Sequence, residues 1–101
     1  MPTHHEIKIN LTDGRVRPDP TDTLEVGDTV RYSSPDGKAR VAFLGKSPYE
    51  VSEVGDSETH TLCQGGHYTF NCFVTPTGSK NEVGWGPGDP DAGGVHDVIP
   101  T

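Results

Sequence analysis

The sequence of 101 residues has one methionine, two cysteines and no apolar run of the ~20 residues that a membrane-spanning helix needs. It also lacks any stretch of twelve or more residues with the 3.6-residue apolar repeat of a helix, whereas it has 13 glycines and 9 prolines. Helices should therefore be minor and turns frequent. With only 30% hydrophobic residues, the chain can build one small core. These features predict a single all-β domain over residues 1–101.

Basic residues are scarce too, with 8 Lys and Arg against 15 Asp and Glu and a net charge of −7. The basic residues form no run. A surface of this charge repels phosphate backbones and anionic membranes, so we expect neither a nucleic acid nor a membrane as a partner. The first residues do not read as a signal peptide. We expect a cytoplasmic protein as the sequence is written, or a periplasmic or extracellular one if the chain is a mature or excised domain.

Alternation of apolar and polar residues, which is typical of half-buried strands, marks most of the chain. The clearest pattern follows a Gly65-Gly66 turn and places Tyr68, Phe70 and Cys72 on one face. A second turn is expected at Asp13-Gly14, where the first strand ends. The strands predicted in this way are residues 5–12, 24–26, 29–32, 39–44, 58–63, 67–72 and 95–99.

Two short motifs within these strands carry a family resemblance. Residues 26–30 read Val-Gly-Asp-Thr-Val, and residues 66–72 read Gly-His-Tyr-Thr-Phe-Asn-Cys. In this order they resemble the cupredoxins, in which the cysteine of the later motif is a copper ligand. The resemblance implies a small Greek-key β-sandwich of seven or eight strands. It also implies that the chain changes from one sheet to the other near Pro18 to Pro20.

The copper ligands that the resemblance implies are mostly replaced in this chain. A blue copper site needs a thiolate and two imidazoles, usually with an axial methionine. The imidazole positions hold Ala39 and Thr75, and no methionine follows them. We therefore expect a copper-free, cofactor-free binding or scaffolding module in which Cys72 is a small core residue. The alternative is copper binding or electron transfer at a site rebuilt around Cys72 by His96 or His67.

The amino terminus offers a second route to copper. Once Met1 is removed, Pro2-Thr3-His4 presents a terminal amine, two amides and an imidazole that can wrap Cu(II) in a square plane. Any chain with histidine in third place can do this, so an accidental site is the alternative interpretation. His60 and His67 are expected on outward strand faces. An enzyme is not expected, because no motif supplies a base or an anion-stabilising group beside Cys72.

Residues 73–94 read as a long irregular loop, with six glycines and three prolines in 22 residues. Loops of this length in small domains are often functional. Trp85 is therefore a candidate anchor for an unknown protein or small ligand, the alternative being a cap over the sandwich. Cys63 and Cys72 should both be free thiols, because the expected strand separates them by about 20 Å.

Overall fold

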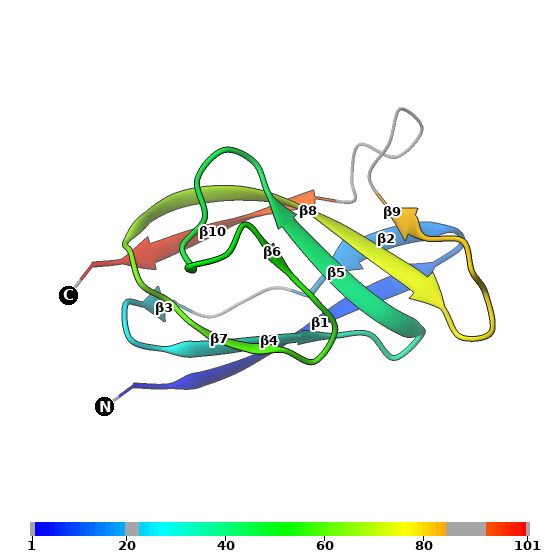
Figure 1. The fold of residues 1–101 in the computed structure, drawn as a ribbon, viewed down its shortest axis with the longest axis horizontal. Helices are drawn as coiled ribbons and strands as arrows, with labels where there is room; N and C mark the ends of the chain where they lie inside the picture. Colours follow the sequence, from blue (N-terminus) through cyan, green and yellow to red (C-terminus); the bar gives the residue numbers. More distant parts are fainter. Residues whose placement is uncertain (1, 20–22, 85–92, 101) are drawn as a thin grey trace.

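The computed structural model describes residues 2–19, 23–84 and 93–100. In these residues the chain forms ten strands and no helix (Figure 1), so none of them contributes a helix long and apolar enough to cross a bilayer. The strands are β1 (His4–Thr12), β2 (Arg15–Pro18), β3 (Leu24–Glu25), β4 (Thr29–Ser33), β5 (Gly37–Phe43), β6 (Glu53–Val54), β7 (Thr59–Thr61), β8 (Gly66–Pro76), β9 (Val83–Gly84) and β10 (Gly93–Ile99). The prediction of an all-β fold is confirmed.

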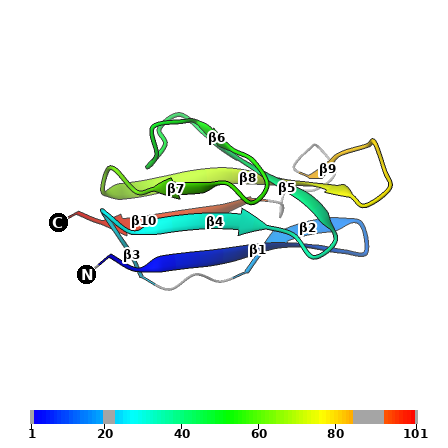
Figure 2. The same cartoon turned by 60° about the horizontal axis from the view of Figure 1, so that its bottom comes forward.

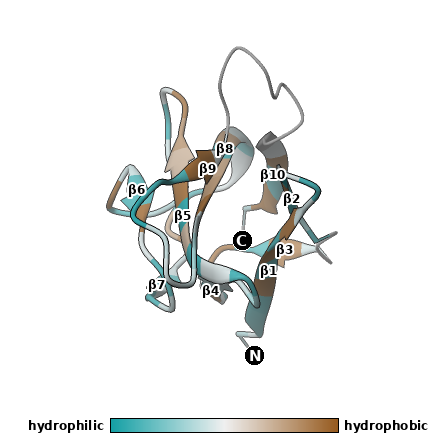
Figure 3. Ribbon diagram, turned by 90° about the vertical axis from the view of Figure 1, so that its right-hand side faces the viewer, coloured by the Kyte–Doolittle hydropathy of each residue, from teal (hydrophilic) through white to brown (hydrophobic). Residues whose placement is uncertain are grey.

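The described strands form two sheets that lie face to face (Figure 2). Sheet I has the order β2-β1-β4-β7, and sheet II has the order β3-β10-β8-β5-β6, with β9 also paired to β8. The pairs β1 with β4 and β3 with β10 are parallel. Because β2 belongs to sheet I and β3 to sheet II, the chain changes sheet between Pro18 and Leu24. On that side β2 contacts β8, β9 and β10, so the sandwich is closed there like half a barrel (Figure 3).

Most of the interior is filled by residues that the alternation placed inward. On β8, Tyr68, Phe70, Cys72 and Val74 are all buried, while the residues between them are exposed or half-buried. The predicted Asp13-Gly14 turn is present, with both residues at positive φ. The other buried hydrophobic residues are Ile7, Ile9, Val16, Leu24, Val30, Tyr32, Ala39, Val41, Phe43, Tyr49, Val54, Leu62 and Val98.

The prediction of an irregular loop over residues 73–94 needs correction at both ends. β8 continues to Pro76, because Val74 extends the buried face and its backbone pairs with Ala39 on β5. At the end of this pairing, a Cβ on Gly37 would lie 2.0 Å from the Thr75 carbonyl oxygen, so only glycine permits the close approach. β9 and the start of β10 account for more of the stretch, and Trp85 lies outside the described residues.

Candidate functional site

Cys72, the candidate copper ligand, lies in the centre of β8 opposite Val41 and is fully buried. Burial raises the pKa of its thiol to about 12, so the thiol is protonated at neutral pH. His96 lies opposite Tyr68, four residues or about 13 Å along β8 from Cys72. His67 is exposed on the outer face of sheet II. Within residues 2–19, 23–84 and 93–100, no three potential ligands are grouped as a metal would require.

His4, the candidate ligand at the amino terminus, is exposed at the start of β1. Its imidazole contacts the Thr29 hydroxyl at 2.7 Å and the Glu6 carboxylate at 3.0 Å. The backbone N–H of Thr3 donates to the buried carboxylate of Asp28 at 2.9 Å. A square-planar copper site would deprotonate this amide, so it would form only at the expense of the Thr3–Asp28 hydrogen bond.

The most unusual feature of the core is a buried chain of three polar side chains from different elements. The hydroxyl of Tyr32 on β4 lies 2.8 Å from the hydroxyl of Tyr49 and 2.9 Å from Nε2 of His96 on β10. His96 is 2% exposed, and its ring lies against Phe70 at 4.4 Å between ring centroids. Sequence reasoning missed this network. His96 stands two residues before the inward-facing Val98, so the two-residue period of a strand would have indicated that His96 also faces inward.

Burial sets the protonation of the network. Desolvation lowers the pKa of His96 to about 4, despite the nearby Asp97 carboxylate, which acts in the opposite direction. Desolvation also raises the pKa of both tyrosine hydroxyls, so all three side chains are neutral at pH 7. Nδ1 of His96 is buried without a hydrogen-bond partner among the described residues. Such a group carries a desolvation cost of about 1–3 kcal/mol.

Tyr49 reaches this network from the connection between β5 and β6, outside any strand. Its ring lies edge-on to Tyr32 and Phe43 and also contacts His60 on β7. Backbone hydrogen bonds hold the connection at its two sides, from Cys63 N–H to the Pro48 carbonyl at 2.7 Å and from Phe43 N–H to the Ser52 carbonyl at 2.9 Å. Tyr49 therefore closes the side of the sandwich between β7 and β6.

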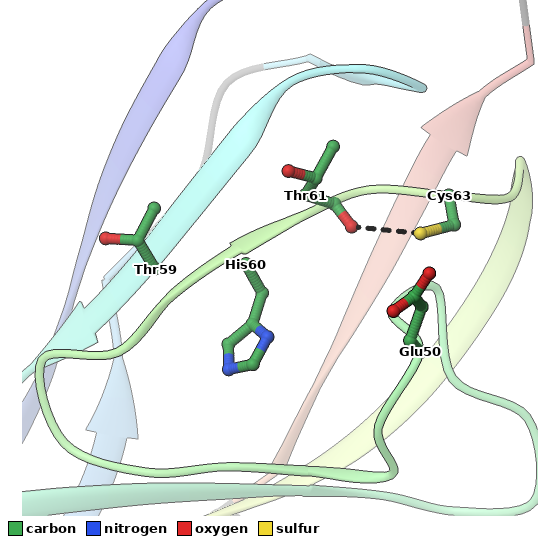
Figure 4. Close-up of a pocket in the computed structure, with 5 residues that line it drawn as sticks. All are labelled: Glu50, Thr59, His60, Thr61 and Cys63. Carbon is green, nitrogen blue, oxygen red and sulfur yellow. Dashed lines mark hydrogen bonds between the residues drawn. The ribbon is translucent and has the colours of Figure 1, made fainter.

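A groove of about 230 Å³ lies next to this closure, lined by Glu50, Thr59, His60, Thr61 and Cys63 (Figure 4). β7 is an edge strand: in the described part of the chain it pairs with β4 alone. Figure 4 shows the His60 ring and the Glu50 carboxylate on one side of β7 and the Thr59 and Thr61 side chains on the other. The groove thus combines a strand edge with one carboxylate, one imidazole and one thiol.

The position of His60 differs from the expected outward one. Residues two apart in a strand share a face, so His60 lies on the same side as the buried Leu62. Its side chain is 26% exposed, packs against Tyr49 and contacts the Glu58 carboxylate at 3.2 Å. His67 lies outward as expected and contacts Asp97 at 2.6 Å. Of the two histidines, His60 is therefore the one that belongs to the groove.

The two cysteines are both free, as the sequence predicts, and differ in exposure. Cys63 is exposed, and its thiol donates to the Thr61 carbonyl at 3.3 Å. We expect one thiol per folded chain, Cys63, to react promptly with a disulfide reagent, and Cys72 to react only after unfolding in denaturant. Absorbance of the released thiol measures both steps, and Cys63→Ser should remove the prompt step alone. Two prompt thiols would contradict the buried position of Cys72.

In comparisons with known proteins, no family model, curated protein or solved structure matches this chain. The function must therefore be inferred from the surface and interior described above. The groove and the Tyr32–Tyr49–His96 network adjoin each other, because Tyr49 belongs to the network and Glu50, the next residue, lines the groove.

Proposed function

We propose that this protein is a copper-free, cupredoxin-like Greek-key sandwich that acts as a binding module. The change of sheet between β2 and β3 supports the cupredoxin-like assignment, since the family resemblance leads us to expect it at this point. The burial of Cys72 and Ala39 supports the copper-free part of the proposal, because both side chains pack in the interior as apolar residues. On this proposal the sandwich is a scaffold, and recognition takes place at its edge.

The observation that carries the proposal is the groove between the edge of β7 and Glu50. An edge strand presents unpaired backbone N–H and C=O groups, which can accept an added strand from an extended peptide. Glu50 on the opposite wall, Glu58 beside His60 and the net charge of −7 favour a basic segment. The proposed ligand is therefore an extended peptide with at least one Lys or Arg. The short length of β7 fits a weak, reversible contact.

Selection from a displayed library of random ten-residue peptides tests this proposal. We expect enriched peptides to carry Lys or Arg within an extended pattern, and their amide shift changes to centre on Thr59, Thr61 and Cys63. Glu50→Lys should weaken binding at least tenfold, because it reverses the charge of one wall. Asp97→Lys is the matched control, since it makes the same charge change at an exposed site on sheet II and should leave binding unchanged.

Two outcomes would count against the proposal. One is peptide binding outside the groove. It would be seen as amide shift changes that avoid β7, or as equal effects of Glu50→Lys and Asp97→Lys on the affinity for the peptide. The other is stoichiometric copper in the purified protein with an intense visible band that Cys72→Ser abolishes, which would favour a rebuilt copper site. Weakly coloured copper that is lost when residues 1–5 are deleted would instead locate metal at His4.

A further inference from the structure

The interior of the sandwich contains a group that cannot accept a proton without structural change. The His96 ring is surrounded by Tyr32, Phe43 and Phe70, with centroid separations of 6.1, 6.2 and 4.4 Å. In its neutral form Nε2 is hydrogen-bonded to Tyr32, and one nitrogen, Nδ1, has no partner in the described part of the chain. A protonated ring would present an N–H at Nδ1 as well, buried and unsatisfied. Protonation therefore requires water to reach the network.

Water can enter most easily where the network is not held by a strand. Tyr32 lies on β4 in the middle of sheet I, and His96 lies on β10, which pairs with β8 and β3. Tyr49 instead lies in the connection of residues 44–52. The backbone of this connection is hydrogen-bonded to the rest of the fold at Leu44, Pro48 and Ser52, and internally through the Ser47 hydroxyl. Displacement of Tyr49 would open the network at the Tyr32 hydroxyl, which contacts both Tyr49 and His96, without separating any paired strands.

The same displacement would alter the groove. Glu50 follows Tyr49 directly, and Pro48 is the acceptor for the Cys63 amide at the floor of the groove. If Tyr49 leaves the interior, the wall that carries Glu50 moves with it. The interior network and the groove are thus mechanically linked through three consecutive residues.

Other titratable groups face the network around His96. Asp97 neighbours His96 on β10 and favours its protonation, whereas His5 on β1 opposes it. Tyr68, opposite His96 on β8, directs its hydroxyl to the carbonyl groups of Gln64 and Gly65. His60 contacts the outer side of Tyr49. It is 26% exposed and contacts the Glu58 carboxylate at 3.2 Å, so it already lies at the solvent-facing side of the closure. Among these groups, His96 is the one whose gain of a proton requires the fold to open.

We propose that residues 44–52 form an acid-operated gate on the groove, with His96 as the proton sensor and Tyr49 as the latch. Acidification protonates His96, Tyr49 leaves the interior, and the groove loses its Glu50 wall. The release of a bound peptide in acid rests on the proposed function of the groove, whereas the opening of residues 44–52 does not. The gate therefore predicts a change in the free protein.

The sign and size of the effect follow from linkage. The closed state holds His96 at a pKa of about 4, and in an open, hydrated state the value returns toward 6.5. The open state therefore binds more protons between these values, so opening becomes more favourable as pH falls through 6.5 and levels off near 4. Between pH 7 and 4.5 the open population should rise roughly 50-fold.

Amide hydrogen exchange measured by NMR tests the gate on the free protein. The amides of Cys63 and Phe43 report on it, since they donate to the Pro48 and Ser52 carbonyls of the connection. After correction for intrinsic exchange, we expect their protection to fall roughly 50-fold from pH 7 to 4.5. The amide of Cys72 in the middle of β8 should lose much less. An equal loss at all three amides would mean global unfolding and would overturn the proposal.

Variants identify the sensor. His96→Phe keeps an aromatic ring in the core but cannot titrate, so the pH dependence at Cys63 and Phe43 should disappear. His60→Gln and the remote control His67→Gln should both retain it. If His60→Gln removes the dependence and His96→Phe does not, His60 is the sensor and the proposal is wrong. Should His96→Phe not fold, NMR titration of the wild-type rings decides: the loss of protection must level off at the pH at which the His96 ring titrates, and a loss that levels off elsewhere would overturn the proposal.

The proposal of an acid-operated gate and the proposal of peptide binding in the groove can be contradicted separately. Retention of a selected Lys-containing peptide should fall over the same pH range as the amide protection if both proposals hold. Opening without any peptide binding would contradict the proposed function alone. Peptide binding that is equally strong at pH 7 and 4.5, with unchanged protection at Cys63, would overturn the gate alone.

Discussion

Phe70→Ala is expected to lower the free energy of unfolding by about 4 kcal/mol, whereas Phe73→Ala on the same strand should cost about 1 kcal/mol. Phe70 is 1% exposed and contacts both Phe43 and His96. Its removal loses the transfer free energy of the ring and leaves a cavity between the sheets. Phe73 lies half-buried on the outer face of sheet II, where the guanidinium carbon of Arg40 lies 4.1 Å from the centroid of its ring.

Urea unfolding followed by circular dichroism at pH 7 measures the difference between these two variants. The pair is matched, because both substitutions remove the same side chain from the same strand and differ only in the face on which it lies. Equal losses, or a larger loss for Phe73→Ala, would mean that the two faces of β8 are assigned the wrong way round. Phe70→Ala should also disturb the packing of His96 and so weaken the closure at Tyr49.

The sequence was sufficient to predict most of the described strands, because the alternation of residues along them is local. The strands β2, β6 and β9 were not predicted, since each has four residues or fewer and is too short to show a repeat. On β8, inward residues at every second position predict the buried face through Cys72, and the structure confirms it. The same rule would have carried the strand on to Val74. The glycine and proline content of the residues that follow led instead to the prediction of an irregular loop from residue 73. Composition was a poorer guide there than periodicity, because the pairing of Gly37 with Pro76 tolerates both residue types at a strand end.

The groove and the network could not be predicted to the same extent, since each depends on residues far apart in the chain. Tyr32 and His96 are 64 positions apart, and Tyr49 joins them from a connection without a repeating pattern. His60 was misplaced for a different reason: its face follows from Leu62 by the two-residue period, which puts both inward. Applied correctly, that rule would have indicated one side of the groove from the sequence.

The position of the network is consistent with a weakly closed edge. On one side of the sandwich β2 contacts strands of sheet II, whereas on the other side Tyr49 occupies the space between β6 and β7. A side chain from a connection fills this space without adding a strand, so the edge of β7 stays available. The connection of residues 44–52, which carries Tyr49, has few backbone hydrogen bonds to the rest of the fold. It can therefore open in acid while the sheets stay paired, as the gate requires.

Asp28→Ala should lower the free energy of unfolding by about 3 kcal/mol. Its buried carboxylate accepts hydrogen bonds from the backbone N–H groups of Thr3 and Glu25 and contacts Nε2 of His5 at 2.9 Å. It thus ties the start of β1 to the turn between β3 and β4. Alanine would leave these donors without an acceptor in a partly buried site. Asp97→Ala, at an exposed carboxylate, should cost less than 0.5 kcal/mol by the usual size of surface effects, about ±0.5 kcal/mol.

The pH dependence of this loss provides an independent check. The hydrogen bond from Thr3, followed by that from His5, lowers the pKa of Asp28 below its ordinary value of 3.8. A carboxyl group with a lowered pKa stabilises the fold fully above its unfolded pKa, and this contribution disappears as pH falls through the folded value. The difference in unfolding free energy between wild type and Asp28→Ala should therefore be constant from pH 7 to 5 and narrow below pH 4. A difference that stays constant down to pH 2, measured by urea unfolding, would show that the carboxylate charge does not hold this corner of the fold together.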